Sequence, residues 1–163
     1  FKVVLGQVMS KGDRMDYAIQ KATELGVTTI QLLTSERCEM RLKYDRDQKK
    51  IDHWQSVAIA ACEQCGMNIV PKILAPLRLE DWFNSNLPAT KLVLAPNKDQ
   101  VDVLNNVSKD LALLIGPEGG LSEAEINAAN AVGFENWCIG SRVLRTETAP
   151  VVALAILNYR LAE

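Results

Sequence analysis

The chain of 163 residues has few of the residues that build metal sites or disulfide frameworks. It contains one histidine, His53, and four cysteines, Cys38, Cys62, Cys65 and Cys138. Cys62 and Cys65 form a single C-x-x-C pair, without a second pair or a histidine at ligand spacing. This pattern favours small buried thiols in a reducing compartment over a metal or redox site. We therefore expect a cytoplasmic protein that uses no metal.

Long apolar runs and excess positive charge are also missing. No apolar run approaches the roughly 18 residues needed to cross a bilayer, and no charged-then-apolar leader opens the chain. The net charge is −2, unlike the basic bulk of a stand-alone nucleic-acid-binding protein. We therefore expect neither a membrane span nor a secretion signal. The 48% of hydrophobic residues can fill the core of one domain of this length.

Positive charge is nevertheless concentrated in one stretch. Residues 37–50 hold six basic residues against three acidic ones. Such runs usually lie on a solvated surface, and a patch that contacts phosphates is the alternative.

Strand and helix patterns alternate along the whole chain. Strands are predicted at residues 3–8, 27–33, 68–74, 91–96, 111–117 and 136–140. Helices are predicted at residues 13–25, in a long stretch that follows residue 45 and ends before Gly66, and at residues 79–84, 123–132 and 146–161. Asp13 is the expected cap of the first helix, and Ser122 with Glu125 makes a capping box for the fourth. The alternation predicts one α/β domain with a mainly parallel sheet.

Two polar loops follow apolar strands of this predicted sheet. One is IGPEGG at residues 115–120, and the other is IGSRVLRTETA at residues 139–149. Ligands of open α/β sheets gather at the carboxyl ends of the strands, and glycine lets a backbone approach a ligand closely. The first loop has neither the Gly-Lys-Ser/Thr ending of a P-loop nor the G-x-G-x-x-G fingerprint. Alone it indicates a tight turn, and together with the second loop it predicts a pocket.

These loops resemble the signature of one enzyme family. LLIGPEGGLSEAEI followed by IGSRVLRTETA is similar to the ribosomal small-subunit uridine-N3 methyltransferases, the RsmE type of the SPOUT superfamily. LGQVMSKGDRMDYAIQKATELGV, SERC and AIAACEQCGMNIVP extend the resemblance over almost the whole chain. Pro150 departs from the family pattern, but it falls in the first turn of a helix, where a missing N–H matters least.

The resemblance implies a SPOUT-type α/β knot, that is, a deep trefoil knot with a mainly parallel sheet flanked by helices, over residues 1–163. It also implies a homodimer and the methylation of N3 of one uridine in 16S ribosomal RNA or the assembled small subunit, with S-adenosylmethionine and without a metal. Family members carry an N-terminal PUA-like barrel that is absent from this sequence. Since strand residues begin at once after Phe1, we expect the chain to be the later part of a longer protein, with RNA affinity reduced by the missing barrel.

The candidate site residues combine the resemblance with the chemistry. A uracil imide must lose its N3 proton before or during attack on the sulfonium methyl, so an enzyme can supply a base or stabilise charge on the carbonyl oxygens. Arg145 is the candidate for charge stabilisation, with a loop-fixing salt bridge as the alternative, and Glu118 and Glu147 are candidates for a base or for orienting Arg145. The cofactor candidates are Leu94, Ala95, Pro96, Ile115, Gly116, Pro117, Gly119, Gly120, Ile139, Gly140, Val143, Leu144, Arg145, Thr146 and Ala149. For the apolar members of this set, core packing is the competing interpretation.

RNA-contacting candidates lie in and after SERC. They are Ser35, Arg37 and Arg41, and helix capping is the alternative role of Ser35. Two other functions stay open, a SPOUT relative that acts on another RNA such as transfer RNA and a non-catalytic RNA-binding module.

Overall fold

The computed structural model describes residues 1–38, 44–96, 102–105, 107, 110–140 and 143–161. Its strands are β1 (Val3–Val8), β2 (Thr29–Thr34), β3 (Lys72–Arg78), β4 (Thr90–Leu94), β5 (Leu111–Ile115) and β6 (Phe134–Trp137). Its helices are α1 (Asp13–Glu24), α2 (Tyr44–Cys65), α3 (Leu79–Phe83), α4 (Glu123–Ala131) and α5 (Thr148–Leu161). The predicted alternation of strands and helices is confirmed.

The six strands form one sheet in the order β3-β2-β1-β5-β4-β6, and every pairing is parallel. Because the strands are parallel, the carboxyl ends of β5, β4 and β6 meet side by side at one edge. The expected α/β class is therefore confirmed, and the trefoil knot stays a prediction.

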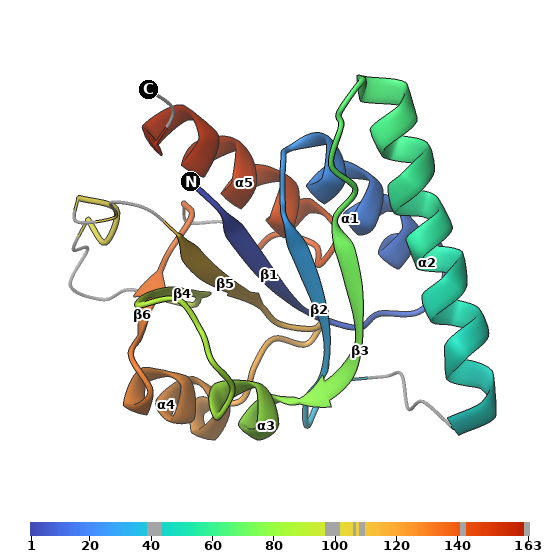
Figure 1. Ribbon diagram of the computed structural model, residues 1–163. Helices are drawn as coiled ribbons and strands as arrows, with labels where there is room; N and C mark the ends of the chain where they lie inside the picture. Colours follow the sequence, from blue (N-terminus) through green and yellow to red (C-terminus); the bar gives the residue numbers. More distant parts are fainter. Residues whose placement is uncertain (39–43, 97–101, 106, 108–109, 141–142, 162–163) are drawn as a thin grey trace.

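Helices cover both faces of the sheet (Figure 1). α1, α2 and α5 lie on one face, and α3 and α4 lie on the other. β5 shows how one strand serves both cores, because Leu111, Leu113 and Ile115 pack with the first group of helices. Ala112 and Leu114 pack with the second group. A strand buried on both faces reads as a continuous apolar run, as LALLI does here.

The packing of α3 against the sheet leaves no room for a side chain at one position of β1. A Cβ added at Gly6 would lie 2.3–2.8 Å from three ring atoms of Trp82, which comes from α3 and is 2% exposed. The absence of a side chain at Gly6 therefore lets the indole lie directly on the strand.

Several predicted boundaries are wrong, and each has a local reason. The third strand starts at Lys72 rather than at residue 68, because the apolar Ile69 and Val70 are 74% and 38% exposed in the connection before it. β6 ends at Trp137, so the chain leaves the sheet earlier than predicted. Asp13 is the first helical residue of α1 rather than its cap.

The capping box of α4 forms as predicted. The Ser122 hydroxyl accepts a bond from the Glu125 N–H, and the Glu125 carboxylate accepts one from the Ser122 N–H. Pro150 lies in the first turn of α5, also as predicted.

The expectation of buried thiols holds only in part. Cys62 is buried, and burial, followed by the neighbouring Cys65, raises the pKa of its thiol. Cys65 and Cys138 are exposed. Cys65 is exposed because it ends α2, and Cys138 because it follows β6 into the loop.

Candidate functional site

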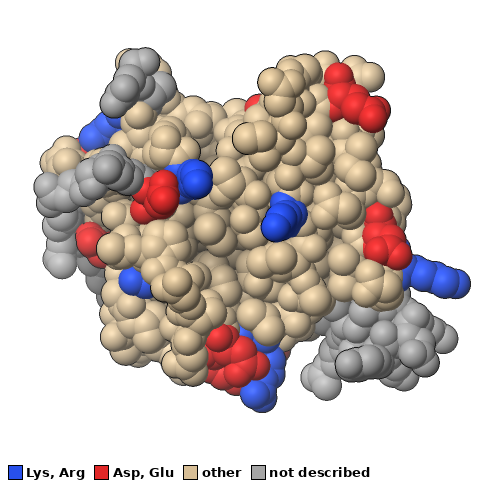
Figure 2. All heavy atoms as spheres, in the orientation of Figure 1, with Lys and Arg blue, Asp and Glu red and all other residues tan. Residues whose placement is uncertain are grey.

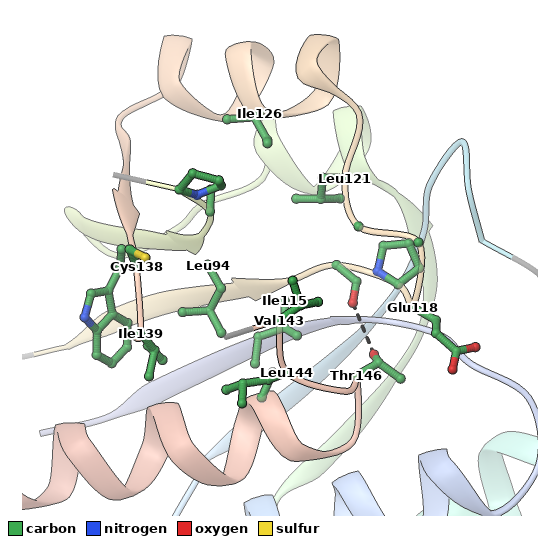
Figure 3. Close-up of a pocket in the computed structure, with 18 of the residues that line it drawn as sticks. Leu94, Ile115, Glu118, Leu121, Ile126, Cys138, Ile139, Val143, Leu144 and Thr146 are labelled. Carbon is green, nitrogen blue, oxygen red and sulfur yellow. Dashed lines mark hydrogen bonds between the residues drawn. The ribbon is translucent and has the colours of Figure 1, made fainter. Parts of the chain in front are cut away.

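A pocket of about 500 Å³ opens at the carboxyl ends of β4, β5 and β6 (Figure 3). This size falls within the roughly 300–1,000 Å³ that is usual for small-molecule sites. Its walls come from the end of β4, the glycine loop (residues 116–120), the start of α4, and the segment from β6 to α5. The lining residues are Leu94, Ala95, Pro96, Ile115, Gly116, Pro117, Glu118, Gly119, Gly120, Leu121, Ile126, Trp137, Cys138, Ile139, Gly140, Val143, Leu144, Thr146 and Ala149.

The glycine loop follows β5 and turns the chain toward α4. The N–H of Gly120 donates to the carbonyl of Pro117 at 2.8 Å, which closes the turn. Gly120 has a φ of 79°, a conformation that side-chain-bearing residues rarely adopt. At the start of the loop, a Cβ on Gly116 would lie 2.8 Å from the side chain of Leu121. Gly116 and Gly120 are thus explained by the turn itself.

A buried threonine joins this loop to the segment before α5. Thr146 is 4% exposed, and its hydroxyl donates to the carbonyl of Gly116 at 3.2 Å (Figure 3). The same hydroxyl accepts a bond from Nε2 of the buried Gln7 at 3.4 Å. Gln7 lies in β1, so one hydroxyl links the end of β1, the end of β5 and the start of α5.

Fourteen of the fifteen cofactor candidates line the pocket, and Arg145 does not. The sequence analysis missed Leu121, Ile126, Trp137 and Cys138. Leu121 and Ile126 belong to the recognised motif and lie close to its glycines, so their spacing was an available signal. Trp137 and Cys138 were missed because the second loop was predicted to begin at Ile139, whereas β6 already ends at Trp137.

The three catalytic candidates lie in different environments. Arg145 is exposed, and within the described residues its guanidinium makes no hydrogen bond or ion pair. The alternative role of a loop-fixing salt bridge thus finds no partner in that part of the chain.

Glu118 lines the pocket wall, but its carboxylate pairs with Arg14 of α1. In Figure 3 this carboxylate points away from the apolar side chains of the pocket. Glu147 has a buried Oε2 atom with no hydrogen-bond partner among the described residues. Neither carboxylate is therefore held against Arg145.

The RNA candidates are placed as follows. The Ser35 hydroxyl is buried and has no partner in the described part of the chain. Arg37 is exposed and donates from Nη1 to the carbonyl of Gly119 at 3.1 Å, so it contacts the glycine loop. Arg41 lies outside the described residues.

The chemistry of the pocket is that of a small-molecule site with an apolar body and backbone polar groups. Its side chains are mostly apolar, and among the described lining residues the only carboxylate, that of Glu118, is paired with Arg14. Throughout residues 1–38, 44–96, 102–105, 107, 110–140 and 143–161, no three His, Cys, Asp or Glu side chains are grouped to hold a metal. Over the same ranges, none of the helices has the length and apolar character to cross a membrane. The arrangement suits a planar organic ligand held by apolar contacts and backbone hydrogen bonds.

Comparisons with known proteins point in one direction. The family model of the RNA methyltransferase domain matches residues 1–158. The ribosomal RNA small subunit methyltransferase E of Buchnera aphidicola subsp. Schizaphis graminum is 38% identical over 161 residues, which cover 98% of this chain and 65% of the relative. The chain therefore spans about 65% of the length of that curated relative.

Two solved structures share the fold closely. A protein of Legionella pneumophila, described as a methyltransferase in complex with S-adenosylmethionine, has a TM-score of 0.93 and 40% identity. That match covers 98% of this chain and 66% of the other. The ribosomal RNA small subunit methyltransferase E of Neisseria gonorrhoeae, bound to S-adenosylmethionine, has a TM-score of 0.88 and 36% identity. It covers 99% of this chain and 67% of the other.

Proposed function

Because this chain belongs to the RNA methyltransferase domain family, we propose that it transfers a methyl group from S-adenosylmethionine to ribosomal RNA of the small subunit. One observation carries the proposal. The two loops that carry the family signature come from separate parts of the sequence, and they line a single pocket of about 500 Å³. The Legionella and Neisseria structures with the same fold hold S-adenosylmethionine, which supports this cofactor for the pocket.

The proposed cofactor site fits the residues present. Leu94, Ile115, Ile139 and Leu144 offer apolar surface for an adenine ring, and the glycine loop offers backbone groups without side chains in front of them. S-adenosylmethionine would supply an electrophilic methyl group on sulfur. We propose that the cofactor is held by the fourteen predicted residues that line the pocket, together with Leu121, Ile126, Trp137 and Cys138. Arg145 is left out of this set. No metal is needed for this reaction.

The target that we propose is N3 of one uridine in 16S ribosomal RNA. N3 of uracil carries a proton, and the negative charge left after its loss is shared with the two flanking carbonyl oxygens. The exposed guanidinium of Arg145 adjoins the pocket residues Leu144 and Thr146 in sequence. A guanidinium offers several fixed donors and stays charged, so we propose that Arg145 stabilises that charge in the transition state.

Of the two carboxylate candidates for the base, we favour Glu147, because its carboxylate is not held in an ion pair among the described residues. The Glu118 carboxylate is neutralised by Arg14 and turned from the pocket. The Glu147 carboxylate keeps one oxygen without a partner among the described residues. Because that oxygen is buried, Glu147 would need a movement of its loop before it could accept a proton from the substrate.

The proposed assembly is a cytoplasmic homodimer formed through α5. One face of α5 packs on the core through Ala153, Leu154 and Leu157, while Tyr159 on the same helix is 86% exposed. An apolar helix that is only partly covered is typical of an interface. Light scattering at micromolar concentration should give twice the chain mass, and a monomer would contradict this assembly.

RNA is the proposed partner even though the net charge is −2. On the face shown in Figure 2, the Lys and Arg side chains stand apart from one another, and several lie beside Asp or Glu. Each phosphate that a protein contacts adds to affinity and steepens its salt dependence. We therefore propose that the basic stretch of residues 37–50 neutralises only a few phosphates and that RNA binding by this chain alone is weak.

Calorimetry with S-adenosylmethionine, followed by nucleoside analysis of treated small ribosomal subunits, tests the function. We expect binding with a dissociation constant in the low-micromolar range or weaker, about −8 kcal/mol at 1 μM. Methylated uridine in the treated subunits would support the substrate. Binding without methylation would favour the non-catalytic RNA-binding module, and methylation of transfer RNA instead would favour the other SPOUT activity. Absence of any binding of S-adenosylmethionine would refute the proposed methyltransferase activity.

A further inference from the structure

The glycine loop receives two arginine side chains from outside the pocket. Its own hydrogen bonds fix its ends, since Gly120 closes onto Pro117 and the carbonyl of Gly116 accepts from Thr146. Between these ends, Glu118 pairs with Arg14 and the carbonyl of Gly119 accepts from Arg37. The middle of the loop is therefore held from outside.

Arg37 itself belongs to a tight turn after β2, residues 35–38. The N–H of Cys38 donates to the carbonyl of Ser35 at 3.2 Å, and the Cys38 thiol donates to the carbonyl of Met9 at 3.3 Å. The N–H of Glu36 donates to Oε2 of Glu125 at 3.0 Å. Glu125 is also the residue whose carboxylate accepts from the Ser122 N–H in the capping box of α4.

This turn is thus bonded at two points to the segment that runs from the glycine loop into α4. One tie runs through Glu36 to the capping box of α4, and the other runs through Arg37 to Gly119. Arg37 also packs on the loop at Gly119, since the nearest atoms to a Cβ built there are Cδ and Cβ of Arg37, at 3.7 and 3.8 Å, which is ordinary van der Waals contact. The stem of Arg37 therefore lies over the backbone of the loop while its guanidinium bonds to the carbonyl.

We propose that Arg37 is a positioning residue for the cofactor loop rather than a phosphate contact. Its hydrogen bond orients the peptide between Gly119 and Gly120, which lies in the pocket wall. The group that Arg37 bonds to is a neutral carbonyl. The proposed role therefore depends on a hydrogen-bond donor that reaches this carbonyl, more than on the positive charge of the side chain. This inference rests on the proposed function, since it assigns the role through the cofactor.

The test measures cofactor affinity and RNA affinity in the same variants. Arg37→Ala removes the donor, and Arg37→Lys keeps a donor at similar reach. Arg78→Ala is the matched control, because Arg78 is also an exposed arginine at the carboxyl end of its strand, yet its ion pairs go to Glu80 and Asp81. Calorimetry with S-adenosylhomocysteine gives cofactor affinity, and binding of small-subunit ribosomal RNA over a range of salt gives the number of phosphate contacts.

Arg37→Ala should weaken cofactor binding about three- to tenfold, as expected for one lost hydrogen bond at an exposed site. Its rate at saturating cofactor and the slope of RNA affinity against salt should stay unchanged. Arg37→Lys should recover most of the cofactor affinity, and Arg78→Ala should leave it intact.

The opposite pattern would overturn the inference. If Arg37 contacts phosphate, Arg37→Ala would keep its cofactor affinity and lower the salt slope by about one. Equal weakening by Arg37→Ala and Arg78→Ala would show a general charge effect and would also refute the positioning role. If the wild-type chain binds no S-adenosylhomocysteine, the proposed function itself is refuted, and this inference is refuted with it.

Discussion

Replacing Thr146 by valine tests whether one buried hydroxyl holds the pocket together. Valine keeps the branched shape of threonine and removes the oxygen that donates to Gly116 and accepts from Gln7. The two bonds are 3.2 and 3.4 Å long, so each is weaker than an ideal one. Gln7 also keeps its second bond, from Nε2 to the carbonyl of Val8.

The expected loss of stability follows from these contacts. Burying polar groups that have lost a partner costs about 1–3 kcal/mol, and the long distances place Thr146→Val in the lower half of that range. For a chain of this length, each kcal/mol lowers Tm by about 2–4 °C, so the fall should be roughly 2–8 °C. The affinity for the cofactor should fall as well, about three- to tenfold, because the Gly116 carbonyl in the pocket wall loses the hydrogen bond from Thr146.

Thr28→Val is the matched control for this experiment. The Thr28 hydroxyl donates to the carbonyl of Val3 at 2.9 Å, at the amino end of β2 and on the edge of the sheet opposite the pocket. Thr28→Val should lower Tm by less, because the Val3 carbonyl still accepts a bond from the Thr28 N–H, and it should leave the affinity for S-adenosylhomocysteine unchanged. If both valine variants bind the cofactor equally well, the reasoning that Thr146 anchors the pocket is refuted.

Two further predictions concern the loops themselves. Arg145→Ala should lower the methylation rate about a hundredfold and leave cofactor affinity within a few-fold, as for one lost charge-stabilising group; loss of cofactor with an unchanged rate at saturation would reverse the assignment. Gly120→Ala should destabilise the loop by about 1 kcal/mol or more and weaken cofactor binding, because its φ of 79° strains any side chain. Gly119→Ala should bind cofactor nearly as well as the wild type, because its Cβ would make an ordinary contact with Arg37; equal effects of both alanines would contradict this distinction.

The fold could be predicted where the local pattern and the packing agree. LALLI is apolar at every position because β5 is buried on both faces, and α4 begins where its capping box predicts. The pattern failed at NIVPKIL, where Ile69 and Val70 are apolar but exposed and the strand begins after them. A short apolar run carries no information about whether a neighbouring strand is there to cover it.

The candidate site could be predicted at the level of its loops. Both loops follow apolar strands, and in a parallel sheet those strand ends share one edge, so their residues were expected to meet. The two arginine contacts to the glycine loop left no such signal, because Arg14 and Glu118 are 104 residues apart in sequence and Arg37 and Gly119 are 82 residues apart. Arg37 was therefore predicted to contact RNA from its charge and from its position in SERC, just before the basic stretch.

The three glycines of the loop differ in what the structure itself requires of them. We expected them to let a ligand approach the backbone, and on that basis Gly119→Val would abolish cofactor binding. In the structure, Gly116 leaves room for the side chain of Leu121, and Gly120 adopts a positive φ. Gly119 has neither constraint, and a side chain there would face Arg37. Two of the glycines are therefore explained by the turn alone, before any ligand is considered. At Gly119 neither the turn nor the contact with Arg37 requires glycine, so close approach of a ligand stays the predicted reason for a glycine at this position.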